Sequence, residues 1–122
     1  MNCVYKNRIG ASGESIARNF LTDKNYKFIK NNYRFDRAEV DLIFEDVKNK
    51  LLLFVEVKTR RSKKFGEPEE SITHSKQENI RKAALGFISN NLEYAGYDLR
   101  IDVIGIFFNE GRIEINHIEN AF

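Results

Sequence analysis

Three charged residues stand out because they fall in runs that are otherwise typical of buried strands. Asp41 lies in the run AEVDLIFED, and Glu56 and Lys58 lie in the run LLLFVEVKTR, which follows after a polar turn. Carboxylates and lysines are costly to bury without a partner, and groups in such settings often belong to functional sites. The hairpin made by these two runs is therefore the strongest lead to chemistry.

Counting residues across the turn predicts which side chains face each other. Side chains alternate between the two faces of a strand. If Asp46 pairs with Leu51, then Asp41 faces Glu56. Like charges directly opposite each other destabilise a sheet, and a divalent cation between them would reverse that effect. Hard oxygen ligands of this kind suit Mg²⁺ or Mn²⁺.

Lys58 follows Glu56 by two residues, so both side chains point to the same face. The same register places Lys58 opposite Glu39, with which it could form an ion pair. Beside a bound cation, the lysine could instead position or activate a water molecule and offset charge on a phosphate. Both roles are compatible with the pattern.

An alternative is a hairpin whose polar face simply meets solvent, a common cause of alternating charges. Ile43, Leu52 and Phe54 lie on that same face and count against it, because they indicate that part of the face is covered. The charges would then lie at one end of the covered face.

The rest of the chain predicts one domain, residues 1–122, with helices and strands in the order α-β-β-β-α-β-β. The fold class is α/β, with a mixed central sheet flanked by helices. Periodicity predicts helices over 8–24 and 74–92, and strands over 26–35, 39–46, 51–59, 97–108 and 112–118.

Composition is that of an ordinary globular protein, with 122 residues, 42% of them hydrophobic and 31% charged. The single Cys3 cannot form an internal disulfide, which favours a reducing compartment such as the cytoplasm. Neither a signal peptide nor a membrane-spanning run is expected. The net charge of +2 says little about partners.

The distribution of charge says more. Basic residues are concentrated just after the hairpin, where they could contact a phosphate backbone or form a solvated loop. Additional candidates precede Asp41 or begin the second predicted helix. The complete set of candidate nucleic-acid contacts is Arg34, Arg37, Arg60, Arg61, Lys63, Lys64 and Lys76.

The segment from Asp41 to the sequence Glu56-Val57-Lys58 resembles the PD-(D/E)xK nuclease motif, with Val40 in place of the proline. The segments GESIARNFL, NNYRFDRAEVDLIF, LLLFVEVKTR, KQENIRKAAL and RIDVI together resemble the YraN-like family of small bacterial proteins. That family is assigned to the restriction-endonuclease-like fold, close to archaeal Holliday-junction resolvases.

The resemblance implies that Asp41 and Glu56 bind the metal and that Lys58 is the catalytic lysine. It also implies a role for Glu14 as a further acidic metal ligand. Glu14 lies at the edge of the first helix's apolar stripe, from which it could reach the sheet; it could equally be a surface residue.

The expected function is a metal-dependent nuclease acting on DNA, with branched or junction DNA among the candidate substrates and a homodimer suggested by the resolvases. A non-catalytic nucleic-acid-binding module is the main alternative, and a protein-interaction adaptor is the third. Asp102 lies in a predicted strand with apolar neighbours on both sides and is expected to make a structural hydrogen bond or ion pair. His74 and His117 do not have the spacing of metal ligands and are expected to be structural or exposed.

Overall fold

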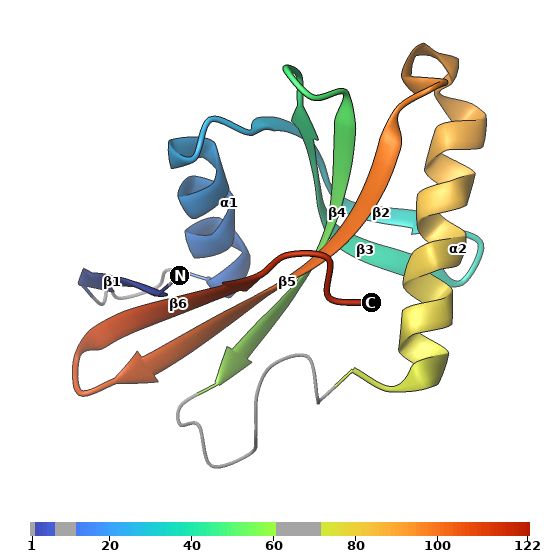
Figure 1. The fold of residues 1–122 in the computed structure, drawn as a ribbon. Coiled ribbons are helices and arrows are strands. Elements are labelled where there is room, and N and C mark those ends of the chain that lie inside the picture. The colour runs from blue at the N-terminus through green and yellow to red at the C-terminus, as the bar shows by residue number, and fades with distance from the viewer. Residues whose placement is uncertain (1, 7–11, 61–71) are drawn as a thin grey trace.

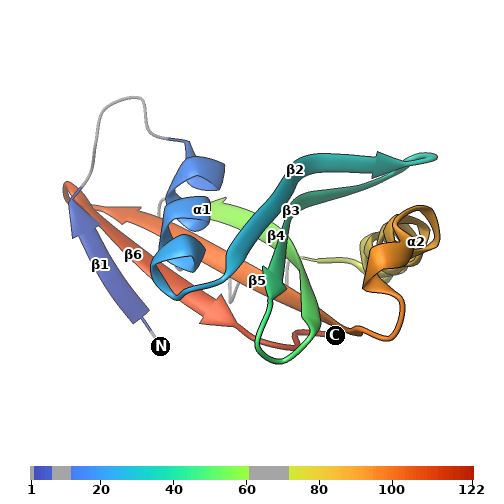
Figure 2. The same cartoon turned by 90° about the horizontal axis from the view of Figure 1, so that it is seen from above.

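A mixed β-sheet runs through the middle of the molecule, with one helix on each face (Figures 1 and 2). The computed structural model describes residues 2–6, 12–60 and 72–122. Within these residues the sheet has six strands in the order β1-β6-β5-β4-β3-β2. Strands β4 and β5 run parallel, and the other neighbouring pairs are antiparallel.

The elements have the following bounds, with η3 a short 3-10 helix. The helices are α1 Gly13–Asp23, α2 His74–Asn90 and η3 Leu92–Tyr94, and the strands are β1 Asn2–Lys6, β2 Lys27–Phe35, β3 Ala38–Asp46, β4 Leu51–Arg60, β5 Asp98–Asn109 and β6 Arg112–Ile118. None of the described helices has the length and apolar character needed to span a membrane.

The predicted fold class and the predicted order of elements from the first helix onward are confirmed. The structure adds β1, which pairs with β6 at the edge of the sheet. Local periodicity did not indicate this strand because its five residues pair with a segment at the other end of the chain. The predicted start of the first helix, at residue 8, falls outside the described residues, and α1 begins at Gly13.

Helix α1 covers one face of the sheet. The Ser12 side chain caps the helix by accepting a hydrogen bond from the Ser15 N–H at 3.1 Å. Its apolar stripe packs on one face of the sheet to form a first core cluster. The fully buried members of that cluster include Ala17, Leu21, Phe44, Leu53, Val55, Ile104, Ile106 and Ile115.

Helix α2 covers the opposite face and forms a second core cluster with Ile43, Phe54 and Val103, among others. The helix is capped by Thr73, whose hydroxyl accepts the Lys76 N–H at 3.2 Å. Since this cap fixes the first turn of α2, it also sets the position from which the Lys76 side chain starts.

Strand β3 leaves β4 partway along its length. The predicted register holds from Asp46–Leu51 to Leu42–Val55, where the pairing of the two strands ends. Beyond that point β3 pairs with β2 alone, and the β2–β3 hairpin extends over α2 (Figure 2). Gly86 permits this approach, because a Cβ atom there would collide with the Phe35 ring.

The departure of β3 corrects one expectation about the hairpin. Simple alternation places Val40 on the same face as Leu42, but Val40 belongs to the core cluster on the α2 side. The physical reason is that the end of β3 follows β2 over α2 and no longer lies flat beside β4. The strand therefore changes neighbours at Asp41.

Candidate active site

Asp41 lies where β3 separates from β4. Its Oδ2 accepts a hydrogen bond from the Val57 N–H at 2.7 Å. The Asp41 side chain thus bonds to the β4 backbone just beyond the last residues that pair β3 with β4. The carboxyl group of Asp41 also lies within hydrogen-bonding reach of Glu56. The two carboxylates that register counting placed opposite each other are thus brought together.

Glu56 points toward the α2 side of the sheet and is almost fully buried, with 4% of its side chain exposed. Its Oε2 lies 2.7 Å from the Nζ of Lys76 and 3.7 Å from the Nζ of Lys58. A buried carboxylate needs such partners because an isolated buried charge is strongly disfavoured. Lys76 therefore joins the site, and it comes from the first turn of α2.

The crowding of charges shifts the protonation equilibria of this cluster. Burial, with the nearby Glu56 next, raises the pKa of Asp41 to about 7, although the Val57 N–H acts in the opposite direction. Burial and then the positive charge of Lys76 lower the pKa of Lys58. The hydrogen bond to Glu56 raises the pKa of Lys76.

Glu14 approaches the same cluster from α1. It is half-buried in the first turn of the helix, and its charge contributes to the raised pKa of Asp41. The preceding Gly13 lies against Thr59 of β4, so closely that a Cβ atom at residue 13 would collide with the Thr59 hydroxyl. This close approach holds the start of α1, and with it Glu14, near the end of β4.

The predicted pairing of Glu39 with Lys58 is wrong. The Oε2 of Glu39 lies 3.0 Å from the Nε of Arg34 on the neighbouring β2 strand. Lys58 instead faces Glu56 on its own strand. Both results follow from the separation at Asp41, because β3 carries Glu39 away from β4 before the predicted pair can form.

The predicted nucleic-acid contacts fall into separate groups. Arg60 continues the Glu56 and Lys58 face of β4, and its charge helps to lower the pKa of Lys58. Its Nε is buried and has no hydrogen-bond partner among the described residues. Arg34 and Arg37 are exposed near the tip of the β2–β3 hairpin. Arg61, Lys63 and Lys64 lie outside the described residues.

The donor set at the site suits a hard divalent cation. Asp41 and Glu56 offer adjacent carboxylate oxygens, and Mg²⁺ is commonly held by one or two carboxylates with water in its other positions. In the described part of the chain, no group of three or more His, Cys, Asp and Glu side chains is arranged as a metal site. Asp41 and Glu56, with Glu14 nearby, are the described carboxylates that could hold such an ion.

Asp102 belongs to a separate buried network on the α1 side. Its carboxylate accepts hydrogen bonds from the side chain of Arg100, at 2.9 Å, and from the Asn120 N–H, at 3.0 Å. His117 Nε2 lies 2.8 Å from Asp102 Oδ2, and His117 Nδ1 lies 2.9 Å from Lys24 Nζ. Burial alone would raise the pKa of Asp102, but these hydrogen bonds lower it. The hydrogen bonds and ion pair expected of Asp102 are confirmed, and His117 is buried in the same network.

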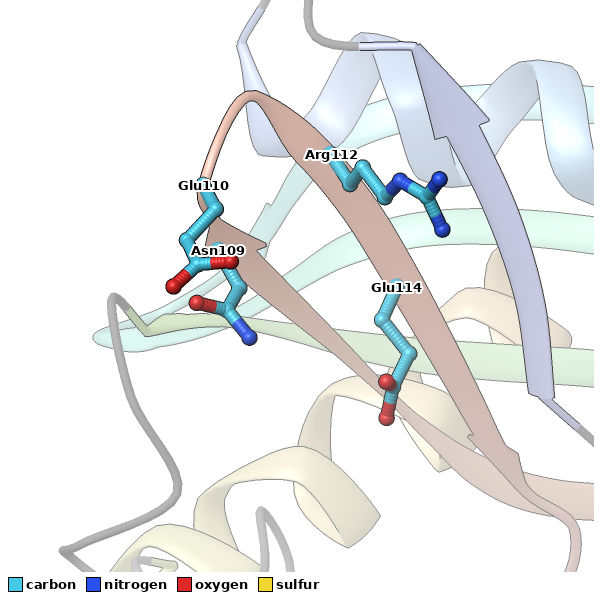
Figure 3. Close-up of a pocket in the computed structure, with 4 residues that line it drawn as sticks. All are labelled: Asn109, Glu110, Arg112 and Glu114. Atoms are coloured by element: carbon cyan, nitrogen blue, oxygen red, sulfur yellow. The ribbon is translucent and has the colours of Figure 1, made fainter.

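A shallow pocket lies elsewhere, at the turn between β5 and β6 (Figure 3). The pocket has a volume of about 360 Å³, and its described lining residues are Asn109, Glu110, Arg112 and Glu114. Among the described residues, none of the candidate site residues from the sequence lines this pocket. The candidate site is defined instead by the side chains that converge where β3 and β4 separate.

A family model described as "Uncharacterised protein family UPF0102" matches residues 13–106 of the chain, a range that includes Glu14, Asp41, Glu56, Lys58 and Lys76. A UPF0102 protein from Alkaliphilus oremlandii is 40% identical over 116 residues, covering 94% of this chain and 97% of the relative. One from Natranaerobius thermophilus is 43% identical over 117 residues, covering 93% and 95%. One from Desulforamulus reducens is 38% identical over 120 residues, covering 97% and 98%.

Proposed function

The chain belongs to the uncharacterised protein family UPF0102, the YraN-like family that its motifs predicted, and we propose its function from its candidate active site. The proposed function is that of a metal-dependent nuclease that hydrolyses phosphodiester bonds of DNA. The observation that carries this proposal is the Asp41–Glu56 carboxylate pair, with Glu56 buried, Asp41 half-buried and Lys58 beside them, at the point where β3 separates from β4. A protein that only bound DNA would gain nothing from carboxylates facing phosphates.

The carboxylates of the site would bind the metal ion. Asp41 and Glu56 would hold Mg²⁺ or Mn²⁺, with Glu14 as a further carboxylate within electrostatic reach of Asp41. The chemistry that such an ion supplies when bound is a more acidic water molecule and positive charge beside the phosphate. Burial of the carboxylates strengthens their hold on a cation, because a charge in a low-dielectric site is poorly screened.

Lys58 would act on the reacting groups directly. Its ammonium lies 3.7 Å from Glu56 Oε2 and 21% of its side chain is exposed, so it can reach both the site and an incoming phosphate. From there it can orient the attacking water and stabilise the negative charge that grows on the phosphate oxygens. Both tasks require a positive donor held in place before the substrate arrives.

Binding of the DNA backbone falls to basic residues beside the carboxylates. Arg60 lies on the same face of β4, and its buried Nε lacks a hydrogen-bond partner within the described residues. Arg61, Lys63 and Lys64 follow in sequence and complete the proposed phosphate-binding segment. A preference for branched DNA, a homodimer and a cytoplasmic location are further parts of this proposal.

The test is cleavage of linear, flapped and branched DNA with Mg²⁺ or Mn²⁺ by the purified protein. Asp41→Asn and Glu56→Gln should abolish cleavage, and Lys58→Met should lower kcat by about 10²-fold or more. Lys82→Met serves as a control, because Lys82 pairs with Asp36 at the hairpin tip. Cleavage that persists in Asp41→Asn would contradict the proposed site. Salt-sensitive DNA binding without cleavage would favour the non-catalytic binding module.

A further inference from the structure

We propose that Lys76 is an exchangeable counter-ion of Glu56: its ammonium occupies the carboxylate oxygen that a divalent cation would take, and on exchange it becomes available to a phosphate of the substrate. This inference rests on the proposed function, since it assigns a role within the same site. Lys76 would therefore be a second active-site lysine, distinct from Lys58 in position and in task.

The geometry around Glu56 distinguishes the two lysines. Lys76 Nζ lies 2.7 Å from Glu56 Oε2, which is the distance of a direct charge-assisted hydrogen bond. Lys58 Nζ lies 3.7 Å from the same oxygen, so it contributes charge without occupying the oxygen's hydrogen-bonding position. A cation approaching Oε2 therefore meets the ammonium of Lys76 first.

The two ends of the Lys76–Glu56 pair differ in their freedom to move. The Glu56 side chain is 4% exposed and is held on a central strand, whereas the Lys76 side chain is 45% exposed. The cap at Thr73 fixes only the Lys76 backbone. The ammonium can thus swing toward solvent on its flexible stem while the carboxylate stays in place.

The charges of the cluster indicate why an exchange is favourable. In the absence of a metal, the ammonium of Lys76 compensates the charge of a buried carboxylate. A divalent cation brings more charge to the same oxygen, so it can replace the ammonium without leaving Glu56 uncompensated. The displaced ammonium of Lys76 then remains near the site where the phosphodiester of the proposed substrate would bind. Lysine binds such an anion as a mobile point charge.

Isothermal titration calorimetry with Mn²⁺ tests this exchange in the full chain. Lys76→Met should bind Mn²⁺ about threefold or more tightly than the unmodified protein, because the ion no longer competes with an ammonium. Lys58→Met should show a smaller gain, as Lys58 is farther from the oxygen. Lys82→Met is the matched control on the same helix: its ammonium pairs with Asp36 at 3.2 Å, its side chain is 54% exposed, and its removal should leave affinity unchanged.

Asp41→Ala identifies where the ion binds, which separates failure of this inference from failure of the proposed function. If Asp41→Ala abolishes Mn²⁺ binding and Lys76→Met leaves the affinity unchanged or weaker, the exchange is refuted and the metal site stands. If Mn²⁺ binds neither the unmodified protein nor Lys76→Met, or binds both regardless of Asp41, the exchange and the proposed nuclease site both fail. Circular dichroism of each variant confirms that it is folded.

Discussion

The carboxylate of Asp41 replaces the β3 backbone as the hydrogen-bond partner of Val57, with Oδ2 at 2.7 Å from the Val57 nitrogen. The same residue therefore ends the pairing of two strands and begins the acidic cluster. Because Val57 lies between Glu56 and Lys58, this bond also fixes the backbone that presents both of those side chains. Strand geometry and site geometry are set by one contact.

We expect Asp41→Asn to be more stable than Asp41→Ala by about 1 kcal/mol, the net contribution typical of one hydrogen bond. Both variants lack the charge, but only the amide of asparagine keeps an oxygen that can accept the Val57 N–H. Urea denaturation of the two variants measures the difference. Equal free energies of unfolding for the two variants would contradict this expectation, because they would mean that water satisfies the Val57 N–H as well as the side chain does.

The raised pKa of Asp41 predicts that the metal-free protein loses stability as the pH rises. The unfolded residue releases its proton near its ordinary value of 3.8, whereas the folded residue retains it up to about pH 7. Across that window the folded state binds more protons, so the free energy of unfolding falls with increasing pH.

Asp41→Asn should remove this pH dependence and stabilise the protein at pH 8 by about 1–3 kcal/mol. Denaturation in EDTA at pH 5 and pH 8 measures both effects. Asp98→Asn, a change at an exposed position of β5, is the control. A wild-type protein and an Asp41→Asn variant that lose equal stability between these pH values would show that Asp41 is not the group responsible.

The contact between α1 and β4 predicts a suppressible mutation. Gly13→Ala should destabilise the protein by about 1–3 kcal/mol, because the new methyl group collides with the Thr59 hydroxyl. Thr59→Ala should cost little by itself, since Thr59 is exposed, and it should restore much of the lost stability in the double variant. A double-mutant cycle by thermal denaturation gives the coupling energy. Additive effects would show that the two residues do not meet.

The buried network around Asp102 should matter for stability rather than for cleavage. Asp102→Ala removes the buried carboxylate that Arg100 and His117 share, although Arg100 keeps its ion pair with Glu119 at 3.1 Å. Breaking a buried ion pair typically costs about 3–5 kcal/mol. Asp98→Ala provides an exposed comparison. Urea denaturation checks the loss, and a stability change below about 1 kcal/mol would contradict the assigned role.

The β3–β4 hairpin could be predicted from sequence because its register depends on a short turn and on alternation within the strands. Its outer part could not, since Val40 and Glu39 are redirected by the packing of the β2–β3 hairpin on α2, through contacts such as Phe35 with Gly86. The predicted pairing of Lys58 with Glu39 is wrong for the same reason, and Lys58 lies beside Glu56 instead.

Contacts between distant segments account for the other differences. The pairing of β1 with β6 joins opposite ends of the chain, and no local pattern predicts which edge of a sheet a terminal segment will take. The sequence indicated Lys76 as a candidate nucleic-acid contact, but its pairing with Glu56 depends on how the cap at Thr73 places the first turn of α2. Such details require the tertiary structure.

The parallel pairing of β4 with β5 has a consequence for the order of folding. The β3–β4 hairpin closes across a short turn and can form within microseconds, whereas β4 and β5 can pair only after the intervening segment with α2 has crossed the sheet. We therefore expect Asp41 and Glu56 to meet early, while water still surrounds them. Desolvation of the carboxylate pair would then be a late step, and divalent ions in the folding buffer should accelerate it.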